Sequence, residues 1–215
     1  MKIRLARENE LKDVVRIYDI LRASPGSTWD EYYPTMEHAK HDFDDGGLYV
    51  VVIQPEDPGF DEAAKVLGIS TCTGAKDSVT AKQANPSDAG AGPDSTCDCA
   101  EGLIVGAVSA VHPDPEEDDE LATALDCWDP RIKNPCDAAR LGILPQMQGQ
   151  GLARKLIAFI LEDAERRGFD GIIFAVSKEN PRAIEIYRSL GFDFCGEFNF
   201  WDEDMYSCQM YFKKE

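Results

Sequence analysis

Hydrophobic positions along the chain fall into two periodicities that predict interleaved strands and helices. Apolar or alternating runs predict strands over 2–6, 48–53, 65–73, 103–111, 141–144, 172–176, 194–201 and 205–212. Apolar residues spaced by three and four predict helices over roughly 10–22, 35–45 and 150–166, and a short one within 179–192. The strand at 172–176 is wholly apolar, which is typical of the centre of a mixed sheet. The pattern indicates a mixed α/β fold.

Two stretches lack either periodicity. Residues 74–101 are rich in Gly, Ala, Ser, Asp, Pro and Thr, and Val79 is their only large apolar residue. Such a segment cannot bury a core, so it predicts a long loop or disordered insertion. Residues 112–120 form a dense acidic run, which is typical of a solvated loop. We therefore expect residues 1–215 to be a single domain carrying one insertion and one acidic loop.

Composition narrows the range of partners. The 215 residues are 43% hydrophobic and carry a formal net charge of −18. An acidic surface repels nucleic-acid phosphates, and it either attracts cationic substrates or serves solubility alone. No apolar run is long enough to span a membrane, and the charged segment 1–8 does not resemble a signal peptide. The sequence thus predicts a cytoplasmic protein with no nucleic-acid or membrane partner.

The metal-ligating residue types show no metal-site spacing. There are seven cysteines, at positions 72, 97, 99, 127, 136, 195 and 208, and their irregular spacing favours reduced thiols. Cys97 and Cys99 lack the two-residue gap of a zinc knuckle or redox pair. His38 and His41 could share a helix face, but a site would need further ligands. We expect no metal.

The stretch 139–153 predicts a main-chain anion site. A short apolar strand ends at Pro145, the segment Gln148–Gly151 follows, and an amphipathic helix starts at once. The first turn of a helix has unpaired N–H groups and partial positive charge, and glycines let a ligand approach the backbone closely. This order of elements favours binding of a phosphate.

Two common phosphate motifs do not fit this loop. A Walker A loop needs Gly-Lys-Ser/Thr, whereas Gly151 is followed by Leu152 and Ala153. A dinucleotide fingerprint needs a third glycine, which residues 149–154 lack. The pattern Gln/Arg-x-x-Gly-x-Gly/Ala does fit residues 148–153, and it resembles the acetyl-CoA pyrophosphate loop of the GNAT N-acetyltransferases. A second register over 146–151 also fits, but the spacing from Pro145 favours the later one.

A second motif carries the same resemblance. Asn180-x-x-Ala183, then Tyr187 and Gly191-Phe192, stand in the order found in that family, one strand and one helix after the loop. The resemblance covers 141–192 and implies a central mixed, largely antiparallel twisted sheet of about 6–8 strands, splayed at its centre and flanked by about 4 helices. It implies an N-acetyltransferase that transfers acetyl from acetyl-CoA to a primary amine in a ternary complex.

The resemblance also assigns residues. It implies that the strand residues Leu141, Gly142 and Ile143 hold the thioester. The other implied cofactor-binding residues are Gln148, Gly149, Gln150, Gly151, Leu152, Ala153, Asn180, Ala183 and Tyr187. Tyr187 would act as the acid that protonates the CoA thiolate, or would only hydrogen-bond the sulfur. Asn180 would bind the cofactor or bridge the central strands. Glu120 is a candidate base, with Asp119, Asp126 and a water relay as alternatives.

The acceptor is less defined than the donor. Trp29, Tyr32 and Tyr33 stand beside two acids in a predicted loop, and they form either a substrate-binding lip or a loop fixed to the core. The expected acceptor is a small-molecule or peptide amine, and the protein is expected to be a monomer or homodimer. The alternatives are a catalytically silent CoA-binding or regulatory module, an acyltransferase using another acyl-CoA, and a nucleotide-binding protein with the same loop.

Overall fold

The computed structural model describes residues 1–69, 102–113, 127–200 and 202–213. The predicted insertion at 74–101 and most of the acidic loop at 112–120 therefore lie outside the described residues. The same holds for the three candidate bases, Glu120, Asp119 and Asp126.

Seven strands form one sheet in the order β1-β2-β3-β4-β5-β7-β6. The strands are β1 (Lys2–Leu5), β2 (Leu48–Ile53), β3 (Leu103–Val111), β4 (Pro135–Ile143), β5 (Gly171–Ser177), β6 (Asp193–Phe200) and β7 (Glu203–Tyr211). Every neighbouring pair is antiparallel except β4 and β5, which are parallel. The predicted mixed, largely antiparallel sheet is confirmed.

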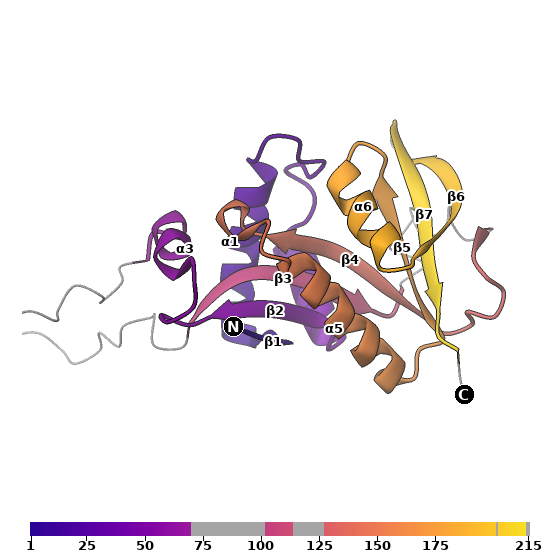
Figure 1. Ribbon diagram of the computed structural model, residues 1–215, viewed down its shortest axis with the longest axis horizontal. Helices are drawn as coiled ribbons and strands as arrows, with labels where there is room; N and C mark the ends of the chain where they lie inside the picture. The colour runs from indigo at the N-terminus through magenta and orange to yellow at the C-terminus, as the bar shows by residue number, and fades with distance from the viewer. Residues whose placement is uncertain (70–101, 114–126, 201, 214–215) are drawn as a thin grey trace, which may run out of the picture.

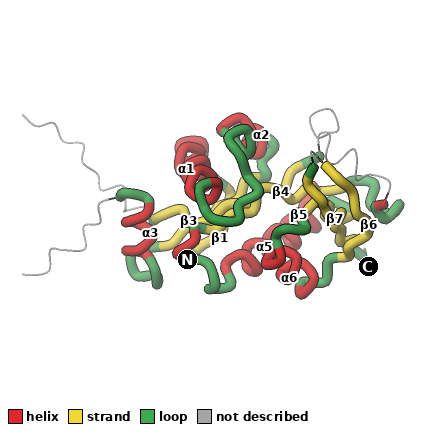
Figure 2. The backbone as a smooth tube through the Cα atoms, turned by 90° about the horizontal axis from the view of Figure 1, so that it is seen from above, coloured by secondary structure: helices red, strands yellow, loops and turns green. Residues whose placement is uncertain are grey.

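Helices cover both faces of this sheet. In the described part of the chain they are α1 (Leu11–Arg22), α2 (Met36–Asp44), α3 (Phe60–Val66), α5 (Leu152–Arg167) and α6 (Pro181–Ser189), with short 3-10 turns η1 (Glu8–Glu10) and η4 (Pro145–Met147). Figure 2 shows α1 and α2 on one side of the strands and α5 and α6 on the other. α3 lies at one end of the molecule, beside η4 and β3 (Figure 1).

The core lies where these helices meet the central strands. All residues of β2 and β3 are buried, and α1 and α5 contact β3 and β4 from opposite faces. Fully buried side chains include Ile17 and Tyr18 of α1 and Leu156, Ile157 and Ile160 of α5. Each buried aliphatic side chain of this size stabilises the fold by about 1.5–3 kcal/mol.

The structure differs from the prediction in the type of one element and in the start of another. The strand predicted over 65–73 is wrong, because its first residues end helix α3 and residues 70–73 lie outside the described part. The buried residues of this segment have helical spacing: they are Phe60, Ala63, Ala64 and Leu67. This buried stripe begins five residues before the predicted strand at 65–73, so the alternating pattern of that segment was misleading. β4 starts at Pro135 rather than near 141, because small and polar residues pair there with β3.

The centre of the sheet opens between β4 and β5. Their pairing is confined to Pro135–Asp137 against Gly171–Ile173, although the strands continue to Ile143 and Ser177. Beyond Asp137, the edge of β4 that faces β5 therefore has no ladder partner. This confirms the predicted splay, and it leaves main-chain groups available to a ligand.

Candidate active site

The glycine loop after β4 has the conformation that an anion site needs. Gly149 and Gly151 have φ of 78° and 75°, the left-handed region that other residues rarely adopt. A Cβ added to either glycine would meet no atom within 4 Å, so the backbone angle rather than crowding requires glycine. Gly151 is the N-cap of α5 and provides no side-chain cap, which leaves the first N–H groups of the helix for a ligand. The loop fits a phosphate group held by main chain.

The side chains of this loop hold its shape. The Nε2 of Gln148 donates to the carbonyl of Ile143 at 3.1 Å, and its Oε1 accepts from Arg182 of α6 at 3.4 Å. The Nε2 of Gln150 lies 4.0 Å from the sulfur of Met147. Leu152 is buried, and Ala153 packs against the core. The two glutamines therefore tie the loop to β4, α6 and η4.

Basic residues surround the loop although the chain as a whole is acidic. Arg182 stands at the start of α6, and Arg154 of α5 donates to the hydroxyl of Ser189 in the last turn of α6. Lys155 of α5 is exposed beside them. This local positive charge complements the partial charge of the helix N-terminus.

Tyr187 lies on α6, close to the splayed strands. Its ring packs against Phe174 of β5 at 4.3 Å and against Phe192 at 5.7 Å between ring centroids. No described residue forms a hydrogen bond with its hydroxyl. Burial raises the pKa of Tyr187, and the nearby thiol of Cys208 adds to the increase. The phenol is therefore protonated at neutral pH and is a hydrogen-bond donor.

Asn180 and Ala183 shape the start of α6. Asn180 is the N-cap, and its Oδ1 accepts a hydrogen bond from the backbone N–H of Ala183 at 3.1 Å. Its backbone N–H donates to Ser177 at the end of β5. Asn180 therefore joins the end of β5 to the first turn of α6.

β4 contains a bulge that includes Leu141, the first of the three residues predicted to hold the thioester. Ala107 of β3 pairs with Gly142 and Ser109 pairs with Ala139, so two residues of β4 oppose the single residue Val108. One of them, Arg140, has φ of 55°. Sequence reasoning missed this residue, because no local motif signals a left-handed arginine inside a strand.

The guanidinium of Arg140 forms an ion pair with a carboxylate on α2. Its Nε and Nη2 donate to the two carboxylate oxygens of Asp42 at 2.8 and 2.6 Å. The side chain of Asp42 is completely buried and that of Arg140 is 10% exposed. A third nitrogen of Arg140 lies 3.5 Å from the hydroxyl of Tyr33.

The loop between α1 and α2 contains aromatic residues that pack onto the protein and one that is exposed. Trp29 packs edge-on against buried Tyr18, and a Cβ at Gly142 would lie 3.2 Å from its ring. Tyr33 packs against His38 and faces Arg140. By contrast, Tyr32 is 73% exposed. Trp29 and Tyr33 thus fix the loop to the core, and Tyr32 is the residue that a substrate could reach freely.

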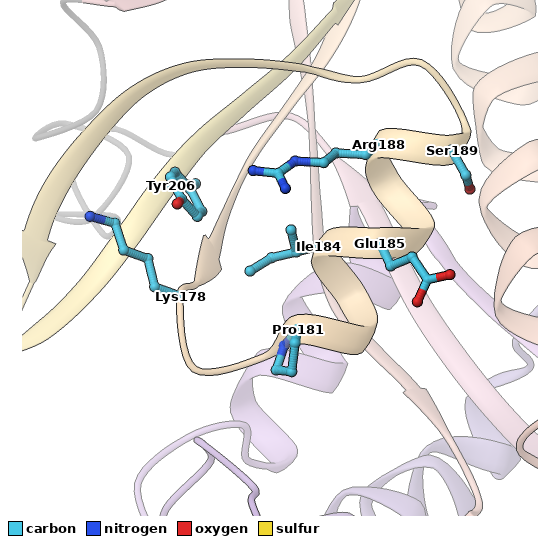
Figure 3. A pocket seen from close by; sticks show the side chains of 7 residues that line it. All are labelled: Lys178, Pro181, Ile184, Glu185, Arg188, Ser189 and Tyr206. Carbon is cyan, nitrogen blue, oxygen red and sulfur yellow. The ribbon is translucent and has the colours of Figure 1, made fainter.

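Two grooves flank the open end of the splay. One of about 450 Å³ lies between the α1–α2 loop and the β6–β7 turn, and is lined by Ser27, Thr28, Lys178, Glu179, Asp202, Glu203 and Asp204. A second of about 630 Å³ lies between α6 and β7, where Ile184 and Arg188 face Tyr206 and Lys178 (Figure 3). The first groove is rich in carboxylates, and one oxygen of Glu203 is buried without a hydrogen-bond partner among the described residues.

The described ranges contain neither a metal site nor a membrane-spanning helix. No group of three His, Cys, Asp or Glu side chains is placed to hold a metal ion there. None of the helices in those ranges is both long and apolar enough to cross a bilayer. Of the cysteines that the structure describes, Cys136, Cys195 and Cys208 are free thiols.

Comparison with known proteins identifies the family. The profile described as Acetyltransferase (GNAT) family matches residues 81–192, just over half of the chain. The chain therefore belongs to the GNAT acetyltransferase family, as the two sequence motifs indicated.

Curated relatives match over shorter stretches. The mycothiol acetyltransferase of Thermobifida fusca is 35% identical over 65 residues, which are 30% of this chain and 18% of that protein. The ribosomal protein bS18-alanine N-acetyltransferase of Escherichia coli is 36% identical over 53 residues, 25% of this chain and 36% of that protein. The chain thus spans less than half the length of either relative.

Solved structures share the fold along the whole chain. The yncA protein of Salmonella typhimurium, solved with its cofactor acetyl-CoA, has a TM-score of 0.58 at 16% identity and covers 100% of this chain and 95% of its own. A ribosomal-protein-alanine N-acetyltransferase from Brucella melitensis has a TM-score of 0.56 at 19% identity, with 99% and 100% covered. At these identities the likeness shows the fold alone.

Proposed function

We propose that the protein is an N-acetyltransferase that transfers the acetyl group of acetyl-CoA to a primary amine by direct attack in a ternary complex. The observation that carries the proposal is the open edge of β4 beyond Asp137, which leads directly into the glycine loop at the start of α5. A ligand with an anionic end and an amide-containing arm fits this sequence of main-chain groups. Family membership supports the same donor.

The proposed chemistry needs few side chains. The amine nitrogen forms a bond to the thioester carbon, the carbon–sulfur bond breaks, and the products are an amide and a thiol. Main-chain N–H groups of Leu141 and Ile143 are the proposed donors to the carbonyl oxygen, because the edge of β4 that faces β5 has no ladder partner there. Tyr187 is the proposed donor to the departing sulfur. Glu120 stays a candidate base, and a water relay is the alternative.

We further propose a positively charged amine as acceptor. The groove between the α1–α2 loop and the β6–β7 turn opens beside the C-terminal end of β5. Its four carboxylates outnumber its one lysine, and Lys178 is itself paired with Glu197. The Escherichia coli relative is named as acting on an alanine of a ribosomal protein, and a peptide N-terminus is therefore the second acceptor class to test.

One experiment separates the proposed activity from its alternatives. Thiol release from acetyl-CoA would be followed with polyamines, amino acids and short peptides as acceptors, and CoA binding would be measured by calorimetry. Release with a cationic amine is expected. CoA binding without release from any amine would indicate a silent binding module, and faster release from succinyl-CoA or malonyl-CoA would indicate another acyl donor. Displacement of CoA by ATP or NAD would favour the nucleotide-binding alternative.

A further inference from the structure

We propose that the buried pair Asp42–Arg140 is a positioning device that holds the bulge of β4 in its left-handed conformation and so aims the main chain at the thioester. The inference rests on the proposed function, because it concerns the strand that would bind the donor. Neither residue touches the substrate in this proposal. Both act through the backbone of Leu141 to Ile143.

The first observation is the backbone of Arg140. Its φ of 55° falls in the region that disfavours residues with a Cβ, and only one other non-glycine in the described ranges, Asp202, has a positive φ. The extra residue in β4 changes which backbone groups point towards β3 and which point towards β5. The orientation of the next three residues therefore depends on this one angle.

The second observation is the geometry of the pair. Two parallel hydrogen bonds of 2.8 and 2.6 Å fix the plane of the guanidinium against the carboxylate of Asp42. Both side chains are buried, so solvent does not weaken the interaction. Asp42 is held on α2, on the face of the sheet that also carries α1. The arginine is thus anchored to a rigid element outside its own strand.

The third observation is that the strand has little room to adjust after the bulge. A Cβ at Gly142 would lie 2.4 Å from Leu21 and 3.2 Å from Trp29. On the neighbouring strand, a Cβ at Gly106 would lie 2.3 Å from Ile143. Because the backbone is confined on both sides, a change at Arg140 would be passed on to the residues that face the splay.

Two double variants distinguish a role of the ion pair in positioning the backbone of β4 from a role in stabilising the fold alone. Asp42→Asn with Arg140→Gly and Asp42→Asn with Arg140→Ala both remove the ion pair and differ by one methyl group. Glycine adopts a positive φ freely, whereas alanine disfavours it by roughly five- to thirtyfold in population. The glycine variant should keep kcat within about threefold of the wild type, and the alanine variant should lose about five- to thirtyfold. Acetyl-CoA affinity should change little in either, because the glycine loop is intact.

The assays would be run well below the unfolding midpoint of both variants, so that all molecules are folded. Equal kcat values for the two double variants would overturn the inference and leave the pair a purely structural feature. If the wild type releases no thiol with any amine, the proposed function fails, and the inference is then tested by the backbone amide NMR shifts of Leu141 and Gly142. Wild-type shifts in the glycine variant alone support it, and identical shifts in both variants overturn it.

Discussion

Replacing Tyr187 by phenylalanine removes one hydroxyl and leaves the aromatic packing in place. The ring contacts with Phe174 and Phe192 do not involve the oxygen, and no described residue hydrogen-bonds it. The fold should therefore be unaffected, and acetyl-CoA affinity should change little. Any change in turnover then reports what the hydroxyl does for the departing sulfur.

The expected size of the effect follows from the pKa. An ordinary tyrosine at about 10 already lies about 1.5 units above an ordinary thiol at about 8.5, so complete proton transfer to the thiolate is unfavourable by about 2 kcal/mol. Burial raises the pKa of Tyr187 further and increases this difference. A hydrogen bond to the charged sulfur, worth about 1.5–3 kcal/mol, is thus the main contribution. Turnover should fall by about ten- to 150-fold.

The measurement is kcat for thiol release at saturating acetyl-CoA and amine, with the thermal unfolding midpoint as a check on folding. Tyr211→Phe is the matched control, since that ring packs against Arg131 at the far end of β7. Turnover that is unchanged when chemistry limits the rate would remove Tyr187 from the mechanism. A loss beyond about a thousandfold would instead show full proton transfer, as general acids provide.

Four further measurements test the site and the fold. The ratio of wild-type to Tyr187→Phe turnover should stay constant through pH 10, because the raised pKa keeps the phenol protonated; an unshifted tyrosine would halve the ratio near pH 10. Gly151→Ala should weaken acetyl-CoA binding by about five- to thirtyfold in calorimetry, whereas Gly46→Ala, with a similar φ and equally open surroundings, should not. Glu203→Gln should raise KM about fivefold for a dicationic amine and leave a neutral one unchanged, and equal effects on both would contradict a charge-selective groove. Leu156→Ala should lower the free energy of unfolding by about 2–5 kcal/mol in denaturant titrations, since this side chain is fully buried.

Features that depend on neighbouring residues were predictable from sequence. The glycines of the loop, the stripe of α5 and the cap at Asn180 act within one or two turns of the chain, so their spacing alone indicates their conformation. The run at 65–73 shows the limit of this reasoning, because a short apolar segment fits helix and strand periodicity equally well. Only the tertiary contacts, which bury the stripe from Phe60 to Leu67, show that the segment is the end of a helix rather than a strand.

Features that depend on distant residues were not predictable. Asp42 and Arg140 are separated by 98 positions, and each one alone looks like an ordinary charged residue of a helix or strand. Only the strand order and the bulge bring them together. The groove beside the splay likewise combines three segments, the α1–α2 loop, the end of β5 and the β6–β7 turn, none of which carries a recognisable motif.

Local features of the site were predictable and distant ones were not because main-chain atoms, rather than side chains, carry most of the proposed chemistry. The donor's phosphates and carbonyl would be held mainly by backbone N–H groups, so a chain with a formal net charge of −18 can bind an anion without a large basic surface. Such a site is encoded by backbone angles rather than by side-chain identity. Substitutions that alter φ at Gly151 or Arg140 should therefore impair the enzyme more than the loss of most side chains that line it.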